Sequence, residues 1–333
     1  MTVTDARRPV ADTVRELLAG ATDREPVPSQ ALLTGGRRER IRIGDRPFLL
    51  ERFGRDHDWV LRATGDLACR PLLVWRSGLL DRLPGFLDHG VVAAARDGDA
   101  GVLLLRDVSP WLVGEGDQPI ALEQHLRFVD HLAGLHAGFW GFEDTIGLAP
   151  LSARYLQLSP WVAGAEARRG GAGPIPRLIG HGWQTFVEVS GQAADLVIGL
   201  LREPWPLLAA LERTPMTLLH GDWQLCNLGS HVDGRTIVLD WTVPGRGPAC
   251  ADLAWYLARN AGRLPQSRDE TIAAYRAALE GYGIDTGGWW QRQLELCLLG
   301  GLVQFGWLKA ARRSAELRWW EEQALAGARW LDR

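Results

Sequence analysis

The chain has 333 residues, of which 46% are hydrophobic and 23% are charged, and its formal net charge at pH 7 is −3. This composition is typical of a globular protein with ample core material, and it gives no bulk attraction to nucleic acid or to an anionic membrane. No apolar run reaches the roughly 20 residues of a membrane-spanning helix, and the N-terminal segment lacks the apolar stretch of a secretion signal. The four cysteines are too scattered for a disulfide framework or a metal knuckle, so we expect a cytoplasmic protein.

The first third of the chain predicts a leading helix followed by a small strand-rich unit. Apolar residues at helical spacing predict the leading helix over residues 1–25. Two strand pairs are expected at residues 38–53, turning at Gly44-Asp45, and at residues 91–106. A helical pattern over residues 72–83 lies between them.

The remainder of the chain is predicted to be mainly helical. An apolar stripe predicts a helix over residues 122–140, in which His136 is expected to be a buried, hydrogen-bonded histidine. Two strands are expected around residues 217–219 and 236–240, with a turn at Asp233-Gly234 between them.

Residues 217–260 contain the pattern most informative about chemistry. It reads His220-x-Asp222-x-x-x-x-Asn227, followed by a strand that ends in Asp240. Asp222, on a loop just past a strand, can accept a proton from a substrate hydroxyl. Asn227 and Asp240, at the two ends of a hairpin, supply the oxygen ligands that Mg²⁺ prefers. A proton acceptor beside a magnesium-binding pair is what phosphoryl transfer requires.

This pattern resembles the signature of the aminoglycoside phosphotransferase family, which is kinase-like. His220-Gly221-Asp222, Asn227, Asp240-Trp241 and Asp252-Leu253-Ala254 match that family's motifs in order. The resemblance covers about residues 30–330. It implies that Asp222 is the catalytic base and that Asn227 and Asp240 bind Mg²⁺, with His220 in support. Asp252 begins a helix, where it either caps that helix or braces the catalytic loop.

The resemblance also implies an α+β, protein-kinase-like fold of two lobes. We expect an N-terminal helix over residues 1–26, a small antiparallel-sheet N-lobe over 27–114, and a larger, mainly helical C-lobe over 115–333. The run VLLLRDV at residues 102–108 resembles the family's strand and hinge, where the adenine of a nucleotide bonds to the backbone. The positions implied for binding ATP or GTP here are Leu104, Arg106 and Val108.

The sequence departs from the family at the nucleotide-binding lysine. A working kinase-like enzyme has a lysine on its third strand, held by a glutamate from a helix. The only lysine here is Lys309, and the other 36 basic residues are arginines. On the candidate third strand, residues 48–53, Glu51 stands where lysine is expected, with Arg52 beside it. The following helix has no acid in its early turns, and residues 34–38 lack a spaced series of glycines.

Three interpretations of this departure remain open. In the first, Arg52 or an arginine among residues 37–42 binds phosphate in place of the lysine. Arg52 serves only if the register shifts by one, because adjacent strand residues face opposite sides. In the second, nucleotide binding has been lost and the chain is a binding subunit with a protein or peptide partner, as in peptide natural-product modification. In the third, Asp222, Asn227 and Asp240 serve other chemistry.

Sixteen tryptophans are an unusually large number for this length. Trp223 and Trp241 directly follow the candidate base and a candidate metal ligand, and we expect them to line a cleft for a hydrophobic, planar or sugar-like acceptor. Acidic residues late in the chain are interspersed with arginines, which argues against a polycationic acceptor. The favoured function is Mg²⁺-dependent transfer of the γ-phosphate of ATP or GTP to a hydroxyl of a small molecule, such as an antibiotic or secondary metabolite.

Overall fold

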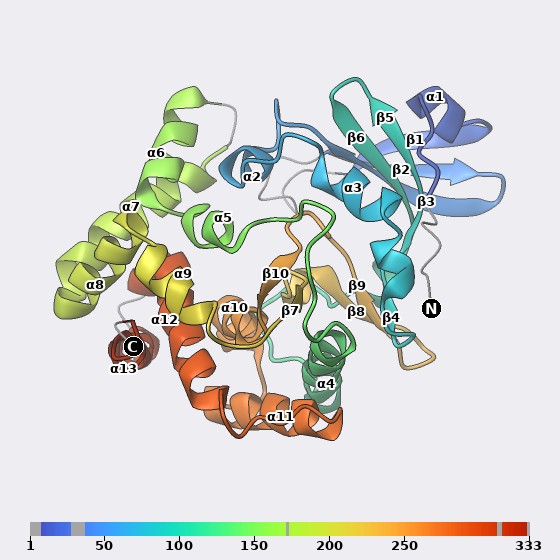
Figure 1. Ribbon diagram of the computed structural model, residues 1–333. Coiled ribbons are helices and arrows are strands. Elements are labelled where there is room, and N and C mark those ends of the chain that lie inside the picture. Colours follow the sequence, from blue (N-terminus) through green and yellow to red (C-terminus); the bar gives the residue numbers. More distant parts are fainter. Residues whose placement is uncertain (1–7, 28–36, 171–172, 312–314, 332–333) are drawn as a thin grey trace.

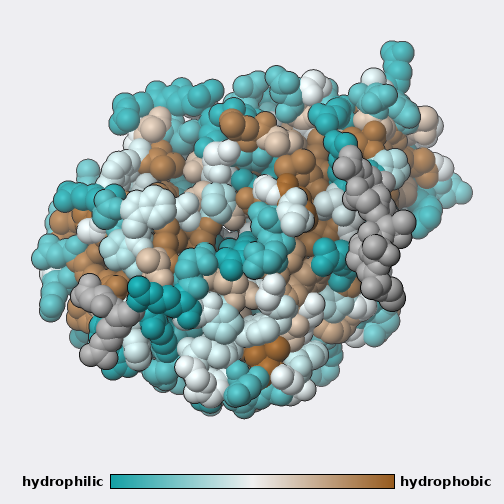
Figure 2. Space-filling model, viewed as in Figure 1, coloured by the Kyte–Doolittle hydropathy of each residue, from teal (hydrophilic) through white to brown (hydrophobic). Residues whose placement is uncertain are grey.

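The computed structural model describes residues 8–27, 37–170, 173–311 and 315–331. A small lobe built on strands lies at one end of the molecule, and a larger, mainly helical lobe forms the rest (Figure 1). Within the described ranges, no helix is long and apolar enough to span a membrane. Hydrophobic residues reach the face drawn in Figure 2 in separate patches, several of them around a hollow near the middle of the view.

The small lobe is built on an antiparallel sheet of five strands in the order β1-β2-β3-β6-β5. The strands are β1 (Ala21–Val27), β2 (Arg37–Ile43), β3 (Arg46–Phe53), β5 (Val91–Asp97) and β6 (Ala100–Arg106). Both predicted strand pairs are therefore confirmed. Gly44 turns β2 into β3 with φ at 58°, a left-handed conformation that favours glycine.

The helix predicted over residues 1–25 is wrong for most of the part that the structure describes, and residues 1–7 lie outside the described residues. Within residues 8–25 only α1 (Val14–Leu17) is an α-helix, and the chain then turns at Gly20 and enters β1. One turn is enough to lay the apolar residues of this segment over the outer face of the sheet, against Ile41 and Leu50. Without β1, β2 would be an edge strand with unpaired backbone N–H and C=O groups, and residues 21–27 pair with these groups as β1.

The inner face of the sheet packs toward the large lobe. Short helices α2 (Trp59–Ala63) and α3 (Arg70–Arg76) lie on this side (Figure 1). The helix predicted over residues 72–83 is interrupted, because Gly78 adopts φ of 69° and a 3₁₀ turn follows at Leu79–Arg82. Inward-facing residues of the sheet join one continuous core with α3 and the large lobe, and they include Leu49, Phe53, Leu103 and Leu105.

The large lobe is organised around its longest helix, α12. This helix packs against α7, α10 and α13 and is buried along most of its circumference. The helices are α4 (Leu122–Gly138), α5 (Leu151–Leu156), α6 (Pro160–Arg169), α7 (Ile175–Val189), α8 (Gly191–Arg202), α9 (Trp205–Leu211), α10 (Cys250–Asn260), α11 (Arg268–Gly281), α12 (Trp290–Ala310) and α13 (Ala315–Ala328). In α4, His136 is fully buried beside the Tyr275 hydroxyl, as predicted.

Short strands in the large lobe bring the motif residues to one place. They are β4 (Leu87–Asp88), β7 (Met216–Leu219), β8 (Leu228–Ser230), β9 (Thr236–Val238) and β10 (Gly245–Pro248). The strands predicted at 217–219 and 236–240 are present, but they are not partners: β8 intervenes, the turn joins β8 to β9, and β7 pairs with β10. Asn227 just before β8 and Asp240 just after β9 therefore lie at the same end of one hairpin.

Candidate active site

His220 ties the loop after β7 to the end of the β8–β9 hairpin. Its Nε2–H donates to the Leu239 carbonyl at 3.0 Å, and its Nδ1 accepts the Asp222 backbone N–H at 3.2 Å. The ring is buried, with Trp223 and Trp241 packed edge-on against it. Burial lowers the pKa of His220 to about 4, so the ring is neutral and can serve as donor and acceptor at once.

Gly221 is required by the path of this loop. Its φ is +90°, and a Cβ at this position would stand 2.0 Å from the Val243 carbonyl oxygen. The close approach of two backbone segments here admits only a residue without a side chain.

Asp222 is held in one orientation by three side-chain donors. Its Oδ1 accepts the Trp255 indole N–H at 2.8 Å, and its Oδ2 accepts the amides of Gln224 and Asn227, each at 2.8 Å. Burial, together with the negative charge of Asp240, raises the pKa of Asp222 to about 6. A fixed carboxylate with a raised pKa is suited to accept a proton near neutral pH.

Asp240 and Asn227 supply the oxygens for a candidate magnesium site. Asp240 has a φ of 64°, an uncommon conformation for a residue other than glycine, and its Oδ1 accepts the Thr242 hydroxyl. The Asn227 Nδ2 donates to the backbone carbonyl and to Oδ2 of Asp222, so the amide oxygen Oδ1 is the Asn227 atom that can bind a metal ion. In the described part of the chain, three or more His, Cys, Asp or Glu residues do not cluster as a metal site. One carboxylate and one amide oxygen nevertheless fit Mg²⁺, which completes its shell with water and phosphate.

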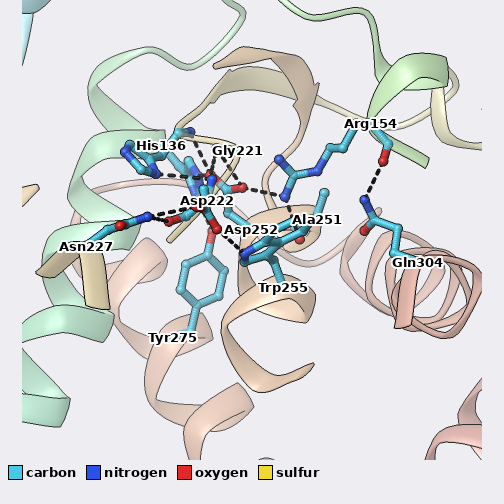
Figure 3. A network of polar contacts seen from close by, with 11 residues as sticks. His136, Arg154, Gly221, Asp222, Asn227, Ala251, Asp252, Trp255, Tyr275 and Gln304 are labelled. Carbon is cyan, nitrogen blue, oxygen red and sulfur yellow. Dashed lines mark hydrogen bonds and ion pairs between the residues drawn. The ribbon is translucent and has the colours of Figure 1, made fainter. Parts of the chain in front are cut away.

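Asp252 braces the loop that carries Asp222 (Figure 3) and makes no capping hydrogen bond at the start of α10. Its carboxylate accepts the backbone N–H groups of His220 at 2.7 Å and Gly221 at 3.2 Å, and pairs with Arg154 at 2.7 Å. Burial opposes the charge, but Arg154 together with His136 and His220 holds the pKa of Asp252 far below its usual range. The loop that carries Asp222 is thus anchored to a buried, ionised group.

A cavity of about 130 Å³ adjoins the candidate base. Asp222 and Asp240 line it together, and Arg259 is the cation on its wall. The rest of the lining is mostly apolar and comes from α2, α7, α10, α12 and neighbouring loops: Trp59, Val60, Leu158, Ile175, Ile179, Val243, Trp255, Phe305 and Trp307, with Gln157, Gln224 and Thr242.

Trp223 and Trp241, expected to line an acceptor cleft, are not among the residues that line this cavity, although Trp241 lines a smaller one beside Asp240. Their exposed fractions are 0% and 5%, and both indoles pack into the core beside His220. The indole that touches Asp222 is that of Trp255, which sequence reasoning missed. The sequence could have indicated Trp255, because residues i and i+3 of a helix share one face, and Trp255 lies three positions after Asp252.

Two further site residues were also missed. Arg259 donates to Gln224 at 2.9 Å, and its charge acts on Asp222. Arg154 lies on α5, about seventy residues before the motif that it supports, and no local pattern marks it as a partner of Asp252.

On the nucleotide side, the structure does not bring Arg52 to the site. Arg52 lies on the outer face of the sheet, where it pairs with Glu39 at 3.2 Å and with Asp97. Glu51 faces inward and lines a small cavity together with Asp240 and Trp241. No register shift occurs in the β2–β3 or β3–β6 pairing, so adjacent residues keep opposite faces.

The three positions expected to contact adenine are also constrained. Leu104 lies on the interior strand β6, opposite Leu50 and Ala93, and its side chain packs in the outer cluster. The Arg106 side chain pairs with Asp88, and its backbone N–H donates to the Gly90 carbonyl at 2.9 Å. The Val108 side chain is buried in the main core. Sheet partners on both sides therefore use the backbone of β6.

Two lobes, with a braced carboxylate and an amide–carboxylate pair at their junction, define a kinase-like fold. Residues 88–293 match the family described as the phosphotransferase enzyme family, APH. The chain belongs to this family, and the resemblance seen in its motifs is confirmed. A search of curated proteins finds no match.

Solved structures agree on the fold. A thermostable mutant of the aminoglycoside phosphotransferase APH(4)-Ia, in a ternary complex with ADP and hygromycin B, is 13% identical, with a TM-score of 0.51 and coverage of 95% of this chain and 97% of that one. Choline kinase LicA from Streptococcus pneumoniae is 12% identical, with a TM-score of 0.51 and coverage of 96% and 97%. At these identities the likeness extends to the fold alone.

Proposed function

We propose that this protein is a Mg²⁺-dependent phosphotransferase that moves the γ-phosphoryl group of ATP or GTP to a hydroxyl of a small molecule. Membership of the family and the kinase-like fold support phosphoryl transfer in general. The observation that carries the finer assignment is the carboxylate of Asp222, oriented by three donors and lining the same cavity as Asp240.

In this reaction the acceptor hydroxyl oxygen attacks the γ-phosphorus, and the bond to the oxygen that bridges the β- and γ-phosphates breaks. The hydroxyl proton passes to Asp222, and the nucleoside diphosphate leaves with the bonding electron pair. Asn227 and Asp240 would hold Mg²⁺, which neutralises phosphate charge when bound. His220 and Asp252 keep the loop of Asp222 in position through the hydrogen bonds described above.

The lining of the cavity supports a compact, largely apolar acceptor. Trp59, Trp255, Phe305 and Trp307 offer aromatic faces, and Arg259 is its one lining cation among the described residues. Its carboxylates, Asp222 and Asp240, are those assigned to the base and the metal. A polycationic acceptor would lack further partners there, whereas an uncharged or anionic planar alcohol would be complemented.

The proposal is tested by calorimetric titration of the protein with Mg·ATP and Mg·GTP. We expect micromolar, magnesium-dependent binding that Asp240→Ala abolishes and that Asp233→Ala, an exposed control on the β8–β9 turn, leaves unchanged. Screening of hydroxylated aromatic acceptors follows with the nucleotide that binds. Absence of binding to both nucleotides would contradict the proposal.

A second candidate function is a binding or partner subunit that retains the fold without transferase activity. The observation in its favour is Glu51, which occupies the inward-facing position where a lysine is expected, while Lys309 is held in α12 by Glu316 and the Ala258 carbonyl. The variant Asp222→Asn distinguishes the two candidate functions. A transferase loses turnover in this variant, whereas a binding subunit keeps its affinity for its protein or peptide partner.

A further inference from the structure

The inner face of the small-lobe sheet carries an ion pair between neighbouring strands. Arg38 on β2 and Glu51 on β3 stand directly opposite each other in the ladder. The Arg38 Nε–H donates to Glu51 Oε1 at 2.6 Å, and Arg38 Nη2 lies 2.6 Å from the same oxygen in an ion pair. Directly opposed residues of opposite charge stabilise such a pair and fix its position on one face of the sheet.

This ion pair lies beside the candidate magnesium ligand. Glu51 and Asp240 line one small cavity. Burial opposes the charge of Arg38, but the carboxylates of Glu51 and Asp240 outweigh it and raise the pKa of Arg38. Burial raises the pKa of Glu51, and Asp240 adds to that shift while Arg38 opposes it. Arg38 is therefore joined to this cavity through Glu51, whereas Arg52 lies on the outer face of the sheet.

The guanidinium retains donors after pairing with Glu51. An arginine carries five N–H donors in a planar fork, and the bonds to Glu51 engage two of them. The Arg38 side chain is 20% exposed, so part of the guanidinium remains accessible to a ligand. Arginine also binds phosphate bidentately and keeps its charge at any physiological pH.

We propose that Arg38, held by Glu51, binds the nucleotide phosphates in the role that a third-strand lysine held by a helix glutamate has in protein kinases. The charges are transposed: the acid stands on the third strand, and the cation comes from the strand beside it. This explains how the chain can lack both the lysine and an acid in the first turn of α3. The inference rests on the proposed function, since it assigns a nucleotide to this face.

The test is calorimetric binding of Mg·ATP and of adenosine to the wild type and to two matched variants, Arg38→Ala and Arg52→Ala. Both arginines lie on the same sheet, pair with acids and are 20% exposed, but on opposite faces. We expect Arg38→Ala to weaken ATP binding by about ten- to hundredfold, the range for loss of a charged hydrogen-bonding partner, and Arg52→Ala to change it less than twofold. Adenosine, which lacks phosphate, should bind the wild type and Arg38→Ala equally.

The outcomes distinguish this inference from the proposed function. If the wild type binds ATP and Arg38→Ala binds it equally well, Arg38 has no role at the phosphates and the inference fails while the proposed function stands. If ATP and adenosine weaken in parallel, Arg38 supports structure only, and the inference is again overturned. If the wild type binds neither ATP nor GTP, both fail together.

A charge exchange provides a second, independent measurement. Arg38→Glu places two acids on the inner face, so we expect it to abolish ATP binding. Adding Glu51→Lys restores an opposed pair, with the cation now on the third strand as in protein kinases, and we expect the double variant to regain at least tenfold in ATP affinity over Arg38→Glu. A double variant that binds ATP no better than Arg38→Glu, while melting at the temperature of the wild type, would refute the role of this pair.

Discussion

The buried carboxylate of Asp252 makes a sharp prediction for stability. Asp252 has no exposed surface and holds His220, Gly221 and Arg154 through bonds of 2.7–3.2 Å. Asp252→Asn keeps the shape of the side chain but removes its charge. It also places an amide N–H₂ group against the N–H donors of His220, Gly221 and Arg154. Arg154, which is 4% exposed, is then left as a buried cation without its counter-ion.

We expect this substitution to lower the free energy of unfolding by about 3–5 kcal/mol, the usual cost of removing one partner of a buried ion pair. That is a large share of the 5–15 kcal/mol typical of a folded domain. The assay is urea denaturation at pH 7 with linear extrapolation. Asp233→Asn, whose carboxylate pairs with Arg235 at the surface, is the control and should leave the urea midpoint nearly unchanged.

The ion pair between Asp252 and Arg154 leads to two further expectations. Adding Arg154→Met to Asp252→Asn removes both charges, so the double variant should be less destabilised than the sum of the two single variants by at least about 2 kcal/mol. Because the pKa of Asp252 is depressed in the folded state, its contribution is present above the unfolded pKa of about 3.9 and declines only in stronger acid. A loss of less than about 1 kcal/mol in the free energy of unfolding of Asp252→Asn at pH 7 would refute the role of Asp252 in holding this loop.

Three other predictions concern the site. Because the pKa of Asp222 is raised, its carboxyl keeps its proton up to about pH 6 in the metal-free folded state, so the free energy of unfolding falls as pH rises from about 4 to 6. Asp222→Asn should remove this fall. Equal pH dependence of the free energy of unfolding in variant and wild type would contradict the prediction. Gly221→Ala should cost more than about 2 kcal/mol, because its Cβ would meet the Val243 carbonyl; Gly199→Ala, in open space on α8, is the control in thermal melts. Asp240→Ala should abolish the magnesium dependence of nucleotide affinity while leaving adenosine binding unchanged, as measured by calorimetry with and without a chelator.

Local sequence patterns were sufficient for much of the fold. The hairpins at residues 38–53 and 91–106 followed from period-two patterns and turn residues, which depend on near neighbours. The order of His220, Asp222, Asn227 and Asp240 identified the family, because closely spaced polar residues around one hairpin are a local feature. The leading helix failed because a periodic apolar segment can be satisfied by one turn against a sheet.

Long-range packing decided the details of the site. Sequence could name Arg52 or an arginine among residues 37–42, but a one-residue change of register exchanges the faces of a strand. The pairing of β2 with β3 excludes Arg52 from the inner face, and the contact with Glu51 distinguishes Arg38 from Arg40, which pairs with Asp107. Likewise, a tryptophan beside a motif residue can point into the core or into a cleft. The packing around His220 buries Trp223 and Trp241, and the position of α10 brings Trp255 to Asp222.

The sequence by itself therefore determined the class of protein, the candidate base and the candidate metal ligands, since these lie within one short, locally patterned segment. Only the tertiary structure decided which cation faces the phosphate side, which aromatic rings line the cavity, and that Arg154 holds Asp252. Each of these depends on contacts between segments far apart in the chain, such as the 98 positions that separate Arg154 from Asp252, and no local pattern encodes such contacts.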